Sequence, residues 1–137
     1  MAARRIVYLA VFLCIVCCGR PARAELVIVC NSATTLDADE ILDVFLGGKQ
    51  FSNGIKLIPV DNAAAQGEFL AKVLRMNSVK YTTYWTKKSF RDGTRQPSQK
   101  VTDADVLEFV RRTPGGVGYV RSIPGGVKVI KKFFDYK

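Results

Sequence analysis

The chain has 137 residues, of which 21 are basic and 12 are acidic, so its formal net charge is +9. This length is enough for one domain with a modest core. The sequence contains no histidine, which removes the commonest general base and the commonest metal ligand in proteins. We therefore expect no enzyme activity, no metal site and no cofactor.

The first 24 residues have the pattern of a secretory signal peptide. Arg4 and Arg5 form a basic start, an apolar run follows from Ile6 to Cys18, and Ala22-Arg23-Ala24 is an A-x-A cleavage site. The apolar run is shorter than the ~20 residues of a membrane-spanning helix, which disfavours a retained anchor. We predict cleavage after Ala24 and export across the inner membrane to the periplasm, with residues 25–137 forming one domain.

Removal of this segment changes the charge and the cysteine count. It carries four basic and no acidic residues, so the remaining domain has a net charge of +5. It also carries three of the four cysteines, and Cys30 alone cannot form an intrachain disulfide. We expect Cys30 to be a small buried apolar residue, with a reactive thiol as the weaker alternative. An exported domain of this size without disulfides is consistent with the bacterial periplasm.

The first half of the domain predicts two strands and two helices. Leu26–Cys30 is a continuous apolar run, typical of a buried parallel strand, and residues 31–34 form a turn. A helix then starts at Asp37, where Glu40 can complete a capping box, and it stops at Gly47-Gly48. Its expected apolar stripe is Ile41, Leu42, Phe45 and Leu46. A strand at 55–60 and a helix at 63–76 follow, with Glu68 and Lys72 one turn apart.

The second half predicts two more helices and two more strands. A helix at 79–90 carries Tyr81, Tyr84, Trp85 and Phe90, which we expect in the core. Residues 91–100 have the composition of a loop. A helix at 103–113 is capped by Thr102, and strands follow at 117–121 and 127–130. This order predicts an α/β domain with a mostly parallel central sheet of four or five strands and about four flanking helices.

Several segments of the chain resemble a known family. They are TLDADEILDVFLGG at 35–48, YTTYW at 81–85, KSFRDG at 88–93 and VLEFVRRTPGGVGYV at 106–120. In this order they resemble the phosphate ABC transporter substrate-binding proteins, of the type II periplasmic binding protein superfamily, and above all the short single-lobe members. The resemblance implies one lobe of that fold, transport-related binding of phosphate or another small anion, and an ABC permease or another envelope protein as partner.

The matching of the phosphate-binding turn is incomplete. In full-length relatives an Arg, an Asp and a Gly-Ser-Gly-Thr turn at a helix start hold the phosphate between two lobes. Here Asp61 is kept, but Ala63 and Ala65 stand at the Ser and Thr positions, and the Arg position falls on Ile58 or Pro59. Backbone N–H groups and the helix end remain as donors, and a buried dianion needs more charge-assisted contacts than these. We therefore expect no tight phosphate binding by this lobe alone.

The main hypothesis is a non-enzymatic binding domain with weak anion binding or an accessory role. A second copy or a partner protein would supply the missing wall of the cleft. The candidate ligand-binding residues lie at two helix starts and in one loop, and they are Asn31, Ser32, Asp61, Asn62, Ala63, Arg91, Gly93 and Arg95. The alternative at the helix starts is that the polar side chains only form turns and caps.

A second hypothesis is a protein- or membrane-surface interaction module without a small-molecule ligand. This hypothesis rests on a C-terminal segment in which basic and aromatic residues are interleaved, namely Lys128, Lys131, Lys132, Phe133, Phe134, Tyr136 and Lys137. The alternative is a solvated strand with its lysines outward. Export makes nucleic acid an unexpected partner. An enzyme is a third and weaker hypothesis, because the acidic residues 37–43 are those that a helix start favours.

Overall fold

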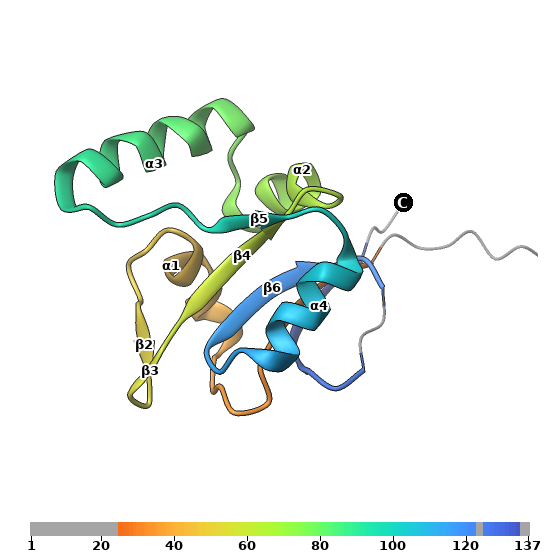
Figure 1. Cartoon of the computed structure of the whole chain (residues 1–137). Coiled ribbons are helices and arrows are strands. Elements are labelled where there is room, and N and C mark those ends of the chain that lie inside the picture. The colour runs from red at the N-terminus through yellow and green to blue at the C-terminus, as the bar shows by residue number, and fades with distance from the viewer. Residues whose placement is uncertain (1–24, 123–124, 135–137) are drawn as a thin grey trace, which may run out of the picture.

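The computed structural model describes residues 25–122 and 125–134, and the predicted signal peptide lies outside the described residues. A five-stranded sheet lies between helices on both faces (Figure 1). In chain order the elements are β1 (Glu25–Cys30), the 3-10 turn η1 (Ala38–Glu40), α1 (Ile41–Phe45), β2 (Phe51–Ser52), β3 (Ile55–Lys56), β4 (Ile58–Asn62), α2 (Gln66–Phe69), the π-helical turn η2 (Leu70–Leu74), α3 (Ser78–Asp92), β5 (Ser98–Lys100), α4 (Asp103–Arg112), β6 (Gly116–Val120) and β7 (Lys128–Phe134). Among these residues, no helix is long and apolar enough to cross a bilayer.

The α/β class is confirmed, but the sheet is mixed rather than mostly parallel. Its strand order is β5-β4-β6-β1-β7. β4 pairs in parallel with β5 and β6, whereas β1 is antiparallel to both β6 and β7. The apolar run of β1 led to the wrong direction because any strand covered on both faces is apolar throughout, whichever way it runs.

Alternate residues of β1 face two separate hydrophobic layers. Leu26, Ile28 and Cys30 point toward α1, α2, η2 and α3, while Val27 and Val29 point toward α4. The larger layer contains three aromatic rings in contact. The ring of Phe69 stacks on Tyr119 with centroids 3.9 Å apart, and Phe45 tilts against Phe69 at 4.7 Å. These contacts fix α1 and α2 over β6.

The helix that begins after Asp37 is shorter than expected and buries a different stripe. The Glu40 carboxylate accepts a hydrogen bond from the Asp37 N–H at 3.4 Å, and Gly47 has the left-handed φ of +77° that ends the helix. Ile41 and Phe45 are buried as expected, but Leu42 is 42% exposed. The third buried residue is Val44, because the first turn is a 3-10 helix and changes the phase of the stripe.

Three other expectations need correction. The strand predicted at 55–60 is two strands, because Asn53-Gly54 turns β2 back onto β3 before β4 begins at Ile58. The predicted loop at 91–100 contains the edge strand β5. Phe90 is 90% exposed, although Tyr81 and Trp85 on the same helix are buried. Phe90 follows Trp85 by five residues, which places it about 140° away around the helix.

Candidate functional site

The candidates that follow β1 and those that end β4 lie at opposite ends of the strands. β1 is antiparallel to β6 and β4 is parallel to β6, so the carboxyl ends of β1 and β4 point in opposite directions. The Asn31 N–H donates to the Gly116 carbonyl at the start of β6, at 2.9 Å. The Asn62 amide donates to the Tyr119 carbonyl near the end of β6, at 3.0 Å. Asn31 and Ser32 therefore do not share a site with Asp61, Asn62 and Ala63.

Asn31 is a buried turn residue. Its amide Nδ2 donates to the carbonyl oxygens of Val110 and Arg111 at 2.7 and 3.1 Å, and its Oδ1 accepts from the Ala33 N–H at 2.9 Å. These contacts tie the end of β1 to the last turn of α4. Ser32 beside it is exposed. The turn-and-cap interpretation accounts for every hydrogen bond of the Asn31 side chain.

Asp61 holds the centre of a buried polar cluster. It is 1% exposed, and its carboxylate accepts hydrogen bonds from the hydroxyls of Tyr81 at 2.6 Å and Tyr119 at 2.9 Å. Burial raises the pKa of Asp61, and the two hydroxyl donors partly offset that rise. Burial, followed by the charge of Asp61, raises the pKa of the Tyr81 phenol, and the nearby Trp85 side chain offsets that rise in part. The indole N–H of Trp85 is buried without a hydrogen-bond partner among the described residues. Asp61 therefore ties β4 to α3 and β6, and it faces no solvent.

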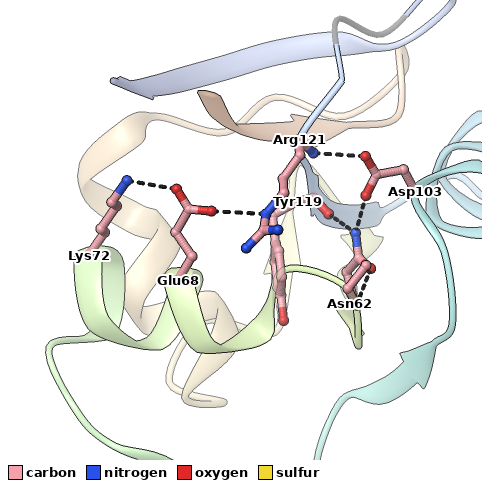
Figure 2. Close-up of polar contacts among 7 residues, drawn as sticks. Asn62, Glu68, Lys72, Asp103, Tyr119 and Arg121 are labelled. Atoms are coloured by element: carbon pink, nitrogen blue, oxygen red, sulfur yellow. Dashed lines mark hydrogen bonds and ion pairs between the residues drawn. The ribbon is translucent and has the colours of Figure 1, made fainter. Parts of the chain in front are cut away.

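Asn62 is also used within the fold. It is fully buried, and its amide donates to Asp103 Oδ1 at 2.7 Å as well as to the Tyr119 carbonyl (Figure 2). Its Oδ1 accepts from the Ala64 N–H at 3.0 Å. Ala63 is exposed, but its N–H donates to the Lys100 carbonyl at 2.8 Å. The donors and acceptors expected for a ligand at this turn are thus occupied by the protein.

A set of ion pairs lies at the carboxyl ends of β4 and β6; we call Asn62, Glu68, Asp103 and Arg121 the carboxyl-edge cluster (Figure 2). Arg121 Nε donates to Glu68 Oε2 at 2.9 Å, and Lys72 Nζ lies 2.6 Å from Glu68 Oε1. The Arg121 N–H donates to Asp103 Oδ2 at 3.0 Å. Ligands of open α/β sheets bind outside the carboxyl ends of the strands. Here a phosphate would meet two carboxylates, and Arg121, the cation of the cluster, is already paired with one of them.

Gly93 and Arg95 lie in a different place, where both line a depression of about 620 Å³. We call it the basic groove. It is lined by residues 49–50, 56–59 and 92–98, with Gly47 and the buried side chains of Val44 and Trp85. Arg91, the remaining loop candidate, is exposed on α3 and does not line the groove.

Some charged side chains of the basic groove have an ion-pair partner and others do not. Lys49 is paired with Glu40 at 2.7 Å, and Asp92 with Lys88 at 3.0 Å. Hydrogen bonds from Thr94, followed by the contact with Lys88, lower the pKa of Asp92. Lys56 and Arg95 have no carboxylate within 4.0 Å among the described residues. These two exposed cations are available to an anion in the groove.

Two other groups of reactive residue types have structural explanations. Asp37, Asp39 and Glu40 bring carboxylate oxygens within 4.8 Å of one another, but all three lie at the start of η1, where the helix dipole favours negative charge. The Lys49 contact lowers the pKa of Glu40. Cys30 is buried, as predicted, and burial raises the pKa of its thiol. A raised pKa keeps the thiol protonated and poorly nucleophilic.

Comparison with models of known protein families gives no match. Comparison with curated protein sequences gives no match either.

Sequence reasoning identified only part of each site. It paired Glu68 with Lys72, and the 2.6 Å contact confirms this pair. It did not identify Arg121 and Asp103, whose positions just after β6 and at the start of α4 are the available signal. Lys56 had no local signal, because its position in the basic groove depends on the chain segment 92–98 across from it.

Proposed function

We propose that this protein is a non-enzymatic binding lobe, related to the substrate-binding proteins of phosphate ABC transporters, and that it binds an anion weakly in the basic groove. The observation that carries the proposal is the presence of two exposed cations without carboxylate partners, Lys56 and Arg95, in a depression of about 620 Å³. The export predicted from residues 1–24 would place this activity in the periplasm.

The carboxyl-edge cluster supports a site in the basic groove rather than at the carboxyl ends of the strands, where ligands of open α/β sheets usually bind. A phosphate there would lie beside the carboxylates of Glu68 and Asp103, and Arg121 would have to leave Glu68 to bind it. Breaking such a charge-assisted contact offsets the gain from a new one. Phosphate binding at the carboxyl ends of β4 and β6 would therefore be weaker than at a site with a free guanidinium.

The size of the groove favours an organic anion over an inorganic one. Pockets for small organic ligands typically enclose ~300–1,000 Å³. Phosphate or sulfate would fill only part of this space, whereas a carboxylate ligand with an apolar body could also contact Ile58 and Pro59. Because the cations are exposed and the groove is open, we expect a dissociation constant on the order of 1 mM.

An accessory role follows from this weak affinity. A single open wall encloses little of a ligand, so a tighter site needs a second wall from an ABC permease, another envelope protein or a second copy of this chain. The proposal includes no catalytic step, because the chain has no histidine and the carboxylates of Asp61, Glu68 and Asp103 are held by protein donors.

Calorimetric titration with citrate, phosphate and sulfate tests the proposal. We expect heat with citrate at millimolar concentration, at least about tenfold weaker binding in Lys56→Gln/Arg95→Gln, and an unchanged result in Arg121→Gln. Arg112→Gln is the matched control, since Arg112 lies on α4 outside the groove and its ion pair with Glu108 is exposed. Absence of heat with all three anions, or equal binding by the groove variant, contradicts the proposal.

The interaction module based on the C-terminal lysines is the less supported candidate. β7 is an edge strand of the sheet, and lysines on an edge strand prevent pairing with other chains. Lys128 donates to the Thr34 carbonyl at 3.1 Å, and Lys131 lies 4.8 Å from the centre of the Phe133 ring. Phe133 is half-buried, and Tyr136 and Lys137 lie outside the described residues.

A further inference from the structure

The side of α3 that faces away from the sheet carries two large apolar side chains in solvent. Phe90 is 90% exposed and Val79 is 72% exposed. Among the residues whose burial is described, they are the two most exposed large hydrophobic side chains. Burial of an exposed phenylalanine ring by a partner is favourable, so this side of α3 is a candidate contact surface.

These two residues belong to one stripe along the helix. Val79, Thr83, Thr86 and Phe90 follow the spacing i, i+4, i+7 and i+11, which places them within a sector of about 60°. Thr83 and Thr86 between them are exposed as well. Val79 and Phe90 lie about 16 Å apart along the helix axis. The spacing is that of a helix that packs lengthwise against another helix.

One flank of the stripe is basic. Lys80, Lys87 and Arg91 lie about 80–120° from Val79 around the axis, on the same side, and all three are exposed. None of them has a carboxylate within 4.0 Å among the described residues. The one acidic residue of α3, Asp92, is paired with Lys88 on another side of the helix. The other flank carries the hydroxyls of Ser78, Thr82 and Ser89.

The stripe takes no part in holding α3 to the domain. The opposite side does so: Tyr81 donates to Asp61, and Tyr84 donates to the Leu46 carbonyl at 2.6 Å. Figure 1 shows α3 at the periphery of the molecule, on the side of the sheet away from α4. Substitutions in the stripe can therefore change binding without changing the core.

We propose that the outer face of α3, defined by Val79, Thr83, Thr86 and Phe90 with the basic flank, binds an acidic amphipathic helix of a partner protein. The apolar residues of that helix would cover Val79 and Phe90, and its carboxylates would lie along Lys80, Lys87 and Arg91. This surface is separate from the basic groove, because none of these residues lines it.

The pattern disfavours the two other occupants. A helix that binds a lipid surface has a wide apolar face, whereas two threonines occupy the middle of this stripe. A second copy of this chain carries the same net positive charge, and an antiparallel pair of α3 helices would bring the two basic flanks together. An acidic helix meets neither difficulty and complements the unpaired charges.

The test uses a defined probe, a helical peptide of roughly 20 residues with leucines at i, i+4, i+7 and i+11 and glutamates along one flank. We expect it to bind the whole protein at concentrations on the order of 100 μM, and a peptide with glutamine in place of glutamate to bind at least about tenfold more weakly. NMR titration should shift the amide signals of Val79, Thr83, Thr86 and Phe90.

Variants make the test specific. Phe90→Ser and Lys80→Gln/Lys87→Gln should each weaken peptide binding at least about tenfold, while Arg112→Gln/Lys132→Gln, which removes the same charge elsewhere, should change it less than about twofold. Phe90 is exposed, so Phe90→Ser should fold normally, and Trp85 fluorescence verifies this. Equal binding of both peptides, no peptide binding at all, or shifts confined to other elements overturns the proposal. Phe90-dependent sedimentation with anionic vesicles, or Phe90-dependent dimerisation, overturns it equally, since either identifies a different occupant.

Discussion

Replacement of Tyr81 by phenylalanine tests the role of the buried Asp61 cluster. The change removes one hydroxyl oxygen and keeps the ring, so the packing of α3 on the domain is preserved. It leaves the Asp61 carboxylate, which is 1% exposed, with one tyrosine donor instead of two. A hydrogen bond to a charged group contributes ~1.5–3 kcal/mol, so we expect Tyr81→Phe to lower the free energy of unfolding by about 2 kcal/mol at pH 7.

The loss should depend on pH in a defined direction. Burial raises the pKa of folded Asp61 above its unfolded value of 3.8. The contribution of this carboxyl to stability is therefore full below that pH and is lost as the pH rises through the folded pKa. The Tyr81 hydroxyl lowers the pKa, so its removal raises the pKa further. The deficit of the variant should thus grow from ~1 kcal/mol near pH 3.5, where Asp61 is protonated, to the larger value at neutral pH.

Urea unfolding followed by fluorescence is the assay. Trp85 is the single tryptophan and is 2% exposed, so its emission reports the loss of this core. The matched control is Tyr84→Phe on the same helix, which removes a hydrogen bond to the uncharged Leu46 carbonyl. We expect the control to cost ~1 kcal/mol at every pH. In the Asp61→Asn background, Tyr81→Phe should also cost ~1 kcal/mol, because no charge is left to stabilise.

The reasoning fails if Tyr81→Phe costs the same at pH 3.5 and pH 7, or the same in the Asp61→Asn background as in the wild-type protein. Either result would mean that the hydroxyl stabilises the fold by packing or through another partner. The carboxylate would then not be the origin of the effect.

Three further predictions concern residues that hold the strands and helices next to the two sites. Gly115→Ala should cost more than ~4 kcal/mol or prevent folding, because a Cβ there would lie 1.9 Å from the Lys56 carbonyl oxygen. Gly93→Ala has a similar positive φ but open space around the Cβ, so it should cost only ~1–2 kcal/mol. Urea unfolding of the two variants compares these losses. Asn62→Ala should cost ~3 kcal/mol in the same assay, since it leaves buried partners unsatisfied, and a loss under ~1 kcal/mol would refute its role at the edge. Arg121→Gln should cost less than ~1 kcal/mol because Arg121 is half-exposed, and thermal unfolding in about 0.5 M salt should remove the difference.

Local signals in the sequence identified many element boundaries correctly. The Thr102 hydroxyl accepts from the Asp105 N–H at 3.2 Å at the start of α4, as its capping pattern predicts. The capping residue, the stop glycine and the apolar stripe of a helix all lie within a few residues of one another. Such signals are complete in the sequence itself. The Asn53-Gly54 dipeptide is a signal of the same kind, because Asn-Gly favours tight hairpin turns, and both residues have the positive φ that such a turn requires.

The arrangement of the strands and sites depended on contacts that no local pattern contains. The buried carboxylate at the end of β4 was identifiable as a polar residue after an apolar strand. Its partners, Tyr81 and Tyr119, come from α3 and β6, and their hydroxyls meet only once both elements have packed. The separation of Asn31 from Asp61 has the same origin, because it depends on the direction of β1 relative to β6.

The position of β1 between β6 and β7 has a consequence for how the protein is made. β1 is the first strand of the sheet in chain order, but Val27 pairs with Val120 and Lys132, which follow it by 93 and 105 residues in the sequence. Contacts between distant parts of a chain form slowly and cannot form before both parts exist. The sheet is therefore incomplete until β6 and β7 have been synthesised, so residues 25–62 alone leave both neighbours of β1 missing.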